Sequence, residues 1–222
     1  MRQRSKLIVA TVAGALLLAG MVVFLLVSGD DDSENPASAA GCERASEPET
    51  RPSDLSPPEQ IVRGDAELTA VVETTCGTFE IALDAERAPK TVSSFAHLAR
   101  EGFYEGLSFH RIAPGFVIQG GDPRGDGTGD PGYTIDEEPP PNLAYTKGVV
   151  AMAKSPAEPP GRSGSQFFVV TGADAGLPPD YALAGRVSKG MNVVERIGGL
   201  GTPAQQPRQT VLIEDIMIRK GG

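Results

Sequence analysis

The chain has 222 residues and a formal net charge of −9 at neutral pH. This length allows one ordinary domain together with additional segments. The acidic balance excludes a nucleic-acid partner, because binding to phosphates needs a basic surface. The chain holds two histidines and two cysteines, and no cluster supplies the three or four ligands that a zinc site requires. We therefore expect neither a metal nor a cofactor.

An apolar run without charged side chains covers residues 7–28 and follows a short basic start at residues 1–6. About 20 apolar residues suffice to cross the hydrocarbon core of a bilayer, and basic flanks stay on the cytoplasmic side. We predict a cytoplasmic start, a transmembrane anchor at 7–28 and a single-pass location in the cell membrane, with the remaining chain on the extracytoplasmic side. Cleavage as a signal peptide and lipidation of a cysteine are the alternatives.

Residues 29–66 are rich in proline, serine, alanine and acidic residues, and they nearly lack large apolar side chains. Such a segment cannot bury enough surface to offset the entropy of ordering it, so we predict a disordered linker. It contains Cys42, whereas Cys76 belongs to the following domain. Outside the cytoplasm the two cysteines can form a disulfide. The alternative of two unrelated cysteines stays open, because spacing alone does not decide pairing.

Residues 67–222 are long enough for one hydrophobic core. Eight strands are predicted, at residues 67–74, 77–83, 107–113, 116–121, 147–153, 165–171, 181–187 and 210–219. In the GTFEIAL segment, apolar residues alternate as in a half-buried strand. Two helices are predicted, one from Pro89 and one from Met191, where apolar residues recur at helical spacing. Because helices do not separate every pair of strands, a mostly β, antiparallel barrel or sandwich is favoured.

The segment SFHRIAPGFVIQGGDPRGDGTG, residues 108–129, places a cation in apolar surroundings. No serine lies in a nucleophile elbow, and an unpaired guanidinium is almost never buried, so Arg111 should lie at a surface. Apolar and amide side chains in this segment and later ones can hold an apolar ring and hydrogen-bond a peptide. This set comprises Arg111, Phe116, Val117, Gln119, Met152, Ala153, Gln166 and Phe168. For any single phenylalanine, a place in the core is the simpler interpretation.

The same segment, together with GVVAMAKS, GSQFFVVT and GRVSKGMNVVERI, resembles the cyclophilins, a family of peptidyl-prolyl cis–trans isomerases. The resemblance extends from about residue 67 to residue 220. It implies a closed eight-stranded antiparallel barrel capped by two α-helices. It also implies roles for individual residues. The catalytic residues would be Arg111, Phe116 and Gln119, and the substrate-binding residues Val117, Met152, Ala153, Lys154, Gln166, Phe168, Leu177 and Tyr181.

The function that the resemblance implies is isomerisation of X–Pro bonds in exported proteins, which assists their folding. This reaction needs no covalent intermediate, because an arginine donor beside an apolar pocket can favour the twisted amide. The expected partners are proline-containing polypeptides and, through the N-terminal helix, the membrane, and the chain is expected to be a monomer. The alternative is a non-catalytic module or surface scaffold that binds proline motifs, which would have less need of Arg111.

Overall fold

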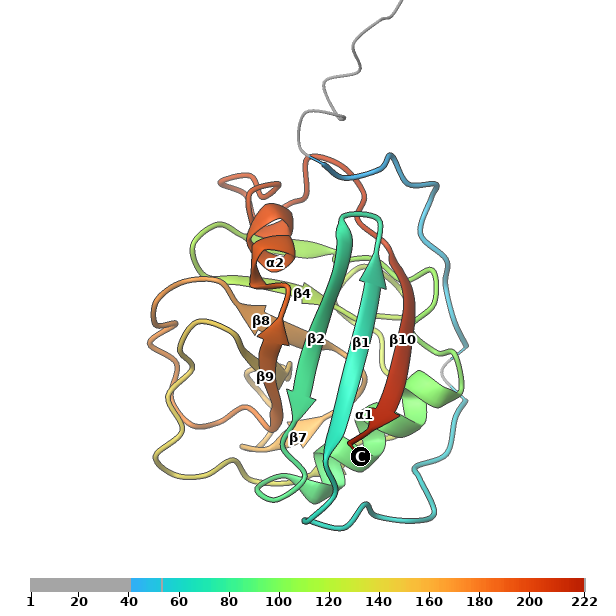
Figure 1. The fold of residues 1–222 in the computed structure, drawn as a ribbon, viewed down its shortest axis with the longest axis vertical. Helices are drawn as coiled ribbons and strands as arrows, with labels where there is room; N and C mark the ends of the chain where they lie inside the picture. The colour runs from blue at the N-terminus through green and yellow to red at the C-terminus, as the bar shows by residue number, and fades with distance from the viewer. Residues whose placement is uncertain (1–40, 53, 222) are drawn as a thin grey trace, which may run out of the picture. The chain divides into compact units, whose positions relative to one another are not determined.

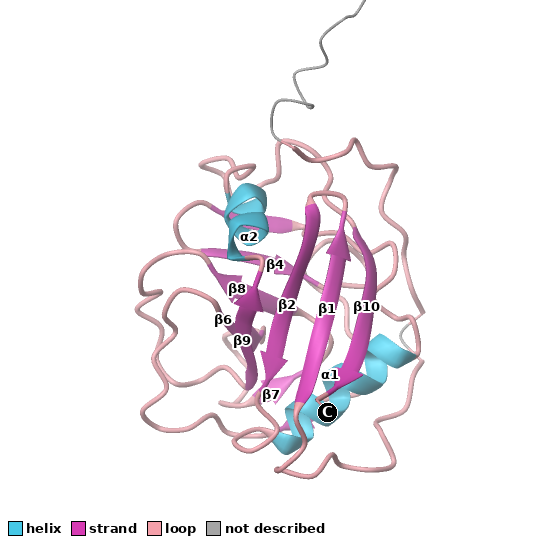
Figure 2. Cartoon of the chain, viewed as in Figure 1, coloured by secondary structure: helices cyan, strands magenta, loops and turns pink. Residues whose placement is uncertain are grey.

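The computed structural model describes residues 41–52 and 54–221. Two α-helices and ten strands lie within these ranges (Figures 1 and 2). The helices are α1 (Pro89–Arg100) and α2 (Met191–Gly198). The strands are β1 (Leu68–Thr74), β2 (Gly77–Leu83), β3 (Arg111–Ala113), β4 (Val117–Gly120), β5 (Ile135–Asp136), β6 (Val149–Met152), β7 (Arg162–Ser163), β8 (Phe167–Val170), β9 (Leu183–Lys189) and β10 (Ile213–Lys220). The predicted membrane anchor, residues 7–28, lies outside the described residues.

Eight of the strands form one curled sheet in the order β10-β1-β2-β9-β6-β8-β4-β3, and β5 pairs with β7 in a separate sheet. The mostly β architecture with two helices agrees with the prediction. The predicted closed barrel is wrong, because no ladder joins the edge strands β3 and β10 in the described part of the chain. At this opening the chain makes an isolated bridge between Ser108 and Leu212, and the Phe109 N–H donates to the Val211 carbonyl (3.0 Å). Apolar alternation predicts strands, but it does not encode which edges of a sheet meet.

The main hydrophobic core is formed by the inward-facing side of the sheet and by buried side chains of both α1 and α2. In it, the Phe95 ring of α1 contacts the rings of Tyr104 and Phe167, with centroid distances of 5.3 and 5.5 Å. A second apolar cluster contains Val117 of β4 and Phe168 of β8. Because successive strand residues point to opposite faces, these strands contribute one row of side chains to the core and the other row to the second cluster. The second cluster forms the floor of the candidate site.

Helix α1 begins at Pro89, whose fixed φ suits the first turn. Its N-cap residue, Ala88, makes no side-chain cap. Instead the carboxylate of Glu137, directly after β5, accepts hydrogen bonds from the backbone N–H groups of Lys90 (3.1 Å) and Thr91 (2.7 Å). These bonds satisfy two of the donors that a helix start leaves unpaired, and they place a negative charge at the positive end of the helix dipole. A loop distant in sequence therefore fixes the start of α1.

Residues 41–52 and 54–66, here called the strap, run along the outside of the domain from the turn between β1 and β2 to the start of β1 (Figure 1). The strap's backbone donates five hydrogen bonds to the domain: Glu43 N to Thr75 O (2.7 Å), Glu49 N to Gly106 O (2.9 Å), Arg51 N to Pro123 O (3.1 Å), Leu55 N to Pro131 O (2.9 Å) and Val62 N to Ser93 Oγ (2.7 Å). Leu55 and Val62 also pack against the main core. The predicted disordered linker is therefore wrong for this part of residues 29–66.

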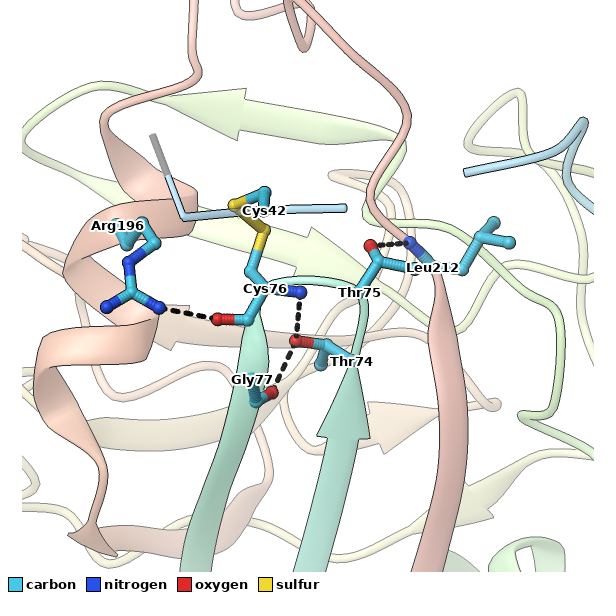
Figure 3. Close-up of a disulfide and its surroundings, with 7 residues drawn as sticks. All are labelled: Cys42, Thr74, Thr75, Cys76, Gly77, Arg196 and Leu212. Carbon is cyan, nitrogen blue, oxygen red and sulfur yellow. Dashed lines mark hydrogen bonds between the residues drawn. A yellow bond between two sulfur atoms is a disulfide. The ribbon is translucent and has the colours of Figure 1, made fainter. Parts of the chain in front are cut away.

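A disulfide between Cys42 and Cys76 attaches the beginning of the strap to the turn between β1 and β2 (Figure 3). The turn has its own hydrogen bonds, because Thr74 Oγ1 accepts from the Cys76 N–H (3.1 Å) and donates to the Gly77 carbonyl (2.6 Å). Arg196 of α2 donates to the Cys76 carbonyl (2.7 Å). The strap is thus covalently joined to a turn that also contacts α2.

Within the ranges that the structure describes, no helix combines the length and the apolar character needed to cross a bilayer. The prediction of a single-pass protein of the cell membrane is corrected on this finding. The apolar run from which it was made, residues 7–28, lies outside those ranges.

Candidate active site

Three neighbouring strands place the side chains of the candidate site on one face of the sheet. Arg111 begins β3 and lies opposite Gln119 of β4, and Gln119 in turn lies opposite Phe168 of β8. The residue before Gln119, Ile118, is fully buried in the core, as the alternation of a strand requires. The turn between β3 and β4 brings Phe116 back towards the arginine, and the Arg111 Cζ atom lies 5.8 Å from the centroid of its ring.

The guanidinium of Arg111 is half-buried and is held by neutral acceptors. Its Nε donates to Oε1 of Gln205 (2.7 Å), and its Nη1 donates to Oε1 of Gln119 (3.0 Å). Among the described residues, no carboxylate forms an ion pair with this group, and Nη2 has no hydrogen-bond partner. A guanidinium carries five N–H donors and no acceptor. The site therefore offers a positively charged donor to a ligand next to the Phe116 ring.

A relay of side-chain amides continues from Arg111 to a glycine-rich loop. Gln119 Nε2 donates to Oε1 of Gln166 (3.0 Å), and Gln166 Nε2 donates to the carbonyls of Gly127 (3.1 Å) and Gly129 (2.9 Å). The loop is held in turn by the buried carboxylate of Asp122, which accepts from the backbone N–H groups of Gly127 and Gly129. Each amide oxygen in this relay accepts and each amide nitrogen donates, so the orientation of both glutamines is fixed.

A hollow of about 150 Å³ lies beside the guanidinium. Its lining consists of Arg111, Phe116, Val117, Gln119, Ala153, Lys154, Phe168, Leu177 and Tyr181. The Phe168 and Tyr181 rings meet edge to face with centroids 5.5 Å apart. The volume is far below the roughly 300–1,000 Å³ of pockets that take drug-sized ligands. The hollow therefore suits a single small ring, held by apolar walls under one cationic donor.

A second, larger hollow of about 650 Å³ lies next to the first and shares Gln119, Ala153 and Lys154 with it. Gln166 and residues 127–130 also line it. The Lys154 ammonium lies at the border, where it donates to the Glu158 carbonyl (3.0 Å) and lies 5.5 Å from the centroid of the Tyr181 ring. The two hollows form one surface that can hold a chain longer than one residue.

Tyr145 supports the small hollow from below, and the sequence did not single it out. Its ring is fully buried, and its hydroxyl donates to the Tyr181 carbonyl (2.6 Å) and accepts from the Tyr181 N–H (3.0 Å). Burial raises the pKa of Tyr145 to about 12, so the hydroxyl remains a donor at neutral pH. Tyr145 therefore fixes the backbone of one wall of the hollow.

Two predicted residues do not line the small hollow. Met152 is almost fully buried in the main core, because its neighbour Ala153 faces the hollow and adjacent residues along this segment point to opposite sides. A substrate-binding role for Met152 is therefore corrected. Gln166 lies in the larger hollow and reaches Arg111 only through Gln119. Gln205, which contacts Arg111 directly, was missed, since nothing in its loop sequence TPAQQP marks it.

His110 precedes Arg111 and belongs to no hydrogen-bond network in the described part of the chain. Both of its ring nitrogens are buried without a partner. Burial lowers the pKa of His110 below its ordinary value, because taking the charged imidazolium out of water is unfavourable. His110 is thus a neutral side chain behind the site rather than a proton donor in it.

One face of the open antiparallel sheet thus carries an arginine, an amide relay and a ring-sized apolar hollow. The family model described as cyclophilin type peptidyl-prolyl cis-trans isomerase/CLD matches residues 69–218. The chain belongs to this family and is a peptidyl-prolyl cis–trans isomerase of the cyclophilin type.

Named relatives and a solved structure agree with this assignment. The chain is 43% identical over 135 residues to peptidyl-prolyl cis-trans isomerase-like 1 of Neurospora crassa, which covers 59% of this chain and 81% of the relative. It is 39% identical over 153 residues to the Mus musculus protein of the same name, covering 67% and 88%. A Cryptosporidium parvum cyclophilin-type isomerase, crystallised in the presence of the dipeptide Ala-Pro, has a TM-score of 0.63 and 29% identity, covering 69% of this chain and 99% of that chain.

Proposed function

We propose that this chain accelerates rotation about X–Pro bonds in polypeptides, with the guanidinium of Arg111 as the donor that favours the twisted amide. One observation carries the proposal. An arginine with no acid partner among the described residues lies next to an apolar hollow of ring size. A buried or half-buried cation without a counter-charge is costly, so its position is understandable if a substrate supplies the missing acceptor.

The apolar lining of the hollow would bind the proline ring, and Arg111 would act as the hydrogen-bond donor. The proline ring would lie against Phe116, Val117, Phe168 and Leu177, which line the hollow. With the ring fixed, the carbonyl before the proline swings while the peptide beyond it stays bound. Gln119 and Gln166 would hydrogen-bond the peptide backbone, and Ala153, Lys154 and Tyr181 would border the groove. Such positioning removes other motions from the barrier to rotation.

The chemistry of the barrier explains why an arginine is suited to this site. The X–Pro amide resists rotation because of its partial double-bond character, and uncatalysed isomerisation takes tens to hundreds of seconds. In the twisted state this conjugation is lost and the prolyl nitrogen becomes a better acceptor. A donor that binds this state better than either planar state lowers the barrier. The guanidinium donates to the neutral oxygens of Gln119 and Gln205, which leave its charge in place, whereas a carboxylate would neutralise it.

The substrate class is supported from two directions. The Cryptosporidium parvum neighbour was crystallised in the presence of Ala-Pro, and we propose proline-containing polypeptides as substrates of this chain too. The Cys42–Cys76 disulfide is typical of oxidising compartments. It supports clients that fold after export, whose slow X–Pro steps this activity would shorten.

The test is turnover of a short Xaa-Pro peptide by the full chain and by Arg111→Ala. We expect turnover to fall at least about tenfold, since each 1.36 kcal/mol of lost transition-state stabilisation is a factor of ten. The melting temperature should stay near that of the parent, because Arg111 makes no ion pair in the described part of the chain. The matched control is Arg124→Ala, which removes the same charge from an exposed position outside the hollows. We expect it to keep parental turnover.

Parental turnover in Arg111→Ala would contradict the role of Arg111. A parent chain that binds the peptide, for example in a fluorescence titration, but does not accelerate its isomerisation would contradict catalysis and favour a binding module.

A further inference from the structure

The guanidinium of Arg111 is fixed by contacts from two sides. Gln119, on the neighbouring strand, holds Nη1, and Gln205, from the loop that follows α2, holds Nε at 2.7 Å. A guanidinium is planar, with its N–H groups in a fixed fork. Hydrogen bonds to two different nitrogens therefore fix both its position and its rotation. With Gln119 alone, the group could turn about that single contact.

The backbone of Gln205 is the second observation. Its φ of 62° makes it the non-glycine residue with a left-handed backbone among the described residues. A β-carbon is unfavourable in this region, and glycine would adopt the conformation without cost. Residues held in such conformations cluster at functional sites, where the surrounding structure maintains them. Position 205 thus carries a glutamine although its backbone conformation would favour glycine.

The surrounding loop shows how the conformation is maintained. The Gln205 carbonyl accepts from the N–H of Ile112, the residue directly after Arg111 (3.0 Å), and the Gln205 N–H donates to the Thr202 carbonyl (2.8 Å). Thr202 and Gln206 close the loop, with Thr202 N donating to Gln206 O (2.9 Å) and Gln206 N donating to Thr202 Oγ1 (3.1 Å). The loop is therefore attached to β3 at the residue next to the arginine, and its side chain reaches back to Nε.

We propose that Gln205 is a positioning residue that holds the Arg111 guanidinium in the orientation needed to donate to the twisted X–Pro amide. The inference rests on the proposed function of Arg111. Gln205 acts through Arg111 rather than on the substrate. Without Gln205, the Arg111 guanidinium should be less well oriented, which lowers kcat. The hollow that binds the proline ring, and hence KM, should stay nearly unchanged.

The test uses Gln205→Gly in the full chain, because glycine accepts the left-handed backbone and removes only the acceptor. We expect kcat on an Xaa-Pro peptide to fall about five- to tenfold with KM within about twofold, and a melting temperature equal to or above that of the parent. Gln205→Asn tolerates the same backbone and keeps an amide, but it is one methylene shorter, and it should lose kcat similarly. Gln206→Ala is the matched control, since its loop contacts are made by backbone atoms, and it should keep parental kcat.

A double-mutant cycle separates positioning from a general effect on the loop. Lysine at position 111 lacks Nε, so Gln205→Gly in the Arg111→Lys background should change kcat by less than about twofold. The proposal is overturned if Gln205→Gly alone leaves kcat within about twofold of the parent, or if it lowers kcat equally in the Arg111→Lys background. Loss of turnover in Arg111→Ala together with full turnover in Gln205→Gly would reject this inference alone. Full turnover in Arg111→Ala would reject the proposed function itself.

Discussion

His110 lies directly before the arginine, with both ring nitrogens buried and unpaired among the described residues. Burial lowers the pKa of His110, and the adjacent charge of Arg111 adds to this effect, while Asp122 and Asp126 oppose it. The unfolded chain has the ordinary value of about 6.5, so it binds a proton more readily than the folded chain. The stability that neutral His110 provides is therefore complete above about pH 6.5 and is lost as the pH falls towards the lower folded pKa.

We accordingly expect the melting temperature of the parent chain to decrease more between about pH 7.5 and 5 than that of His110→Phe, which has no group to protonate there. Thermal unfolding at both pH values measures this difference, and comparing the two chains cancels the titration of shared carboxylates. Equal decreases in the two chains would show that the His110 pKa is the same in the folded and unfolded states.

The residues that surround the small hollow could be anticipated because they fall in long ordered motifs on adjacent strands. Met152 was misplaced although strand alternation places it opposite Ala153. Gln205 could not be found, because it is 94 residues from Arg111 and its role comes from a backbone conformation that the sequence does not mark. Sequence motifs therefore do not predict the contacts in the site that depend on loop geometry.

The strap shows the same limit at the level of an element. Its composition predicts disorder, since it has few apolar residues to bury. It is attached instead through backbone hydrogen bonds to Gly106, Pro123 and Pro131, which any residue except proline can donate. The strands and helices, by contrast, were located because they bury alternating or helically spaced side chains. Composition thus detects elements that bury many apolar side chains and misses one held by backbone hydrogen bonds, a disulfide and a few apolar contacts.

The disulfide should determine how firmly the strap is held. It closes a loop between residues that are 34 positions apart, for which chain entropy gives roughly 3–4 kcal/mol of stabilisation. We expect reducing agent to lower the melting temperature of the parent chain, and Cys42→Ser/Cys76→Ser to melt at the lower temperature regardless of reductant. Thermal unfolding with and without reductant tests this. If the melting temperature of the parent chain did not change with reductant and two thiols could be titrated, the disulfide would not have formed.

In the whole molecule, the sheet and the strap differ in how their amides are protected. Strands β1 and β2 are each paired on both sides, whereas the strap makes scattered single hydrogen bonds. Amide exchange reports such local differences in opening free energy. We expect hydrogen exchange to be slowest at Val72 and Ile81, which are fully buried, and fastest among bonded amides at Glu49 and Leu55. The measurement is exchange followed by mass spectrometry or NMR. Uniform protection would show that strap and sheet open together.

Closure of the sheet is the whole-molecule feature that the sequence did not determine. The places of the eight main-sheet strands were predictable from their apolar segments, whereas β5 and β7 were not predicted and β3, β4, β6 and β8 are shorter than expected. Whether β3 pairs with β10 depends on the path of the chain between them. Within the described ranges, the isolated bridge Ser108–Leu212 and a few backbone hydrogen bonds on either side of it form there in place of a ladder between β3 and β10.

The strap has one practical consequence. It contacts the glycine-rich loop at Pro123 and at Pro131, on either side of the carbonyls that orient Gln166. A fragment that begins at Glu67, just before β1, would keep every side chain of the hollow. It would lose the strap's hydrogen bonds to the loop that holds the amide relay. The unit to isolate for catalysis therefore starts at Gly41 rather than at Glu67.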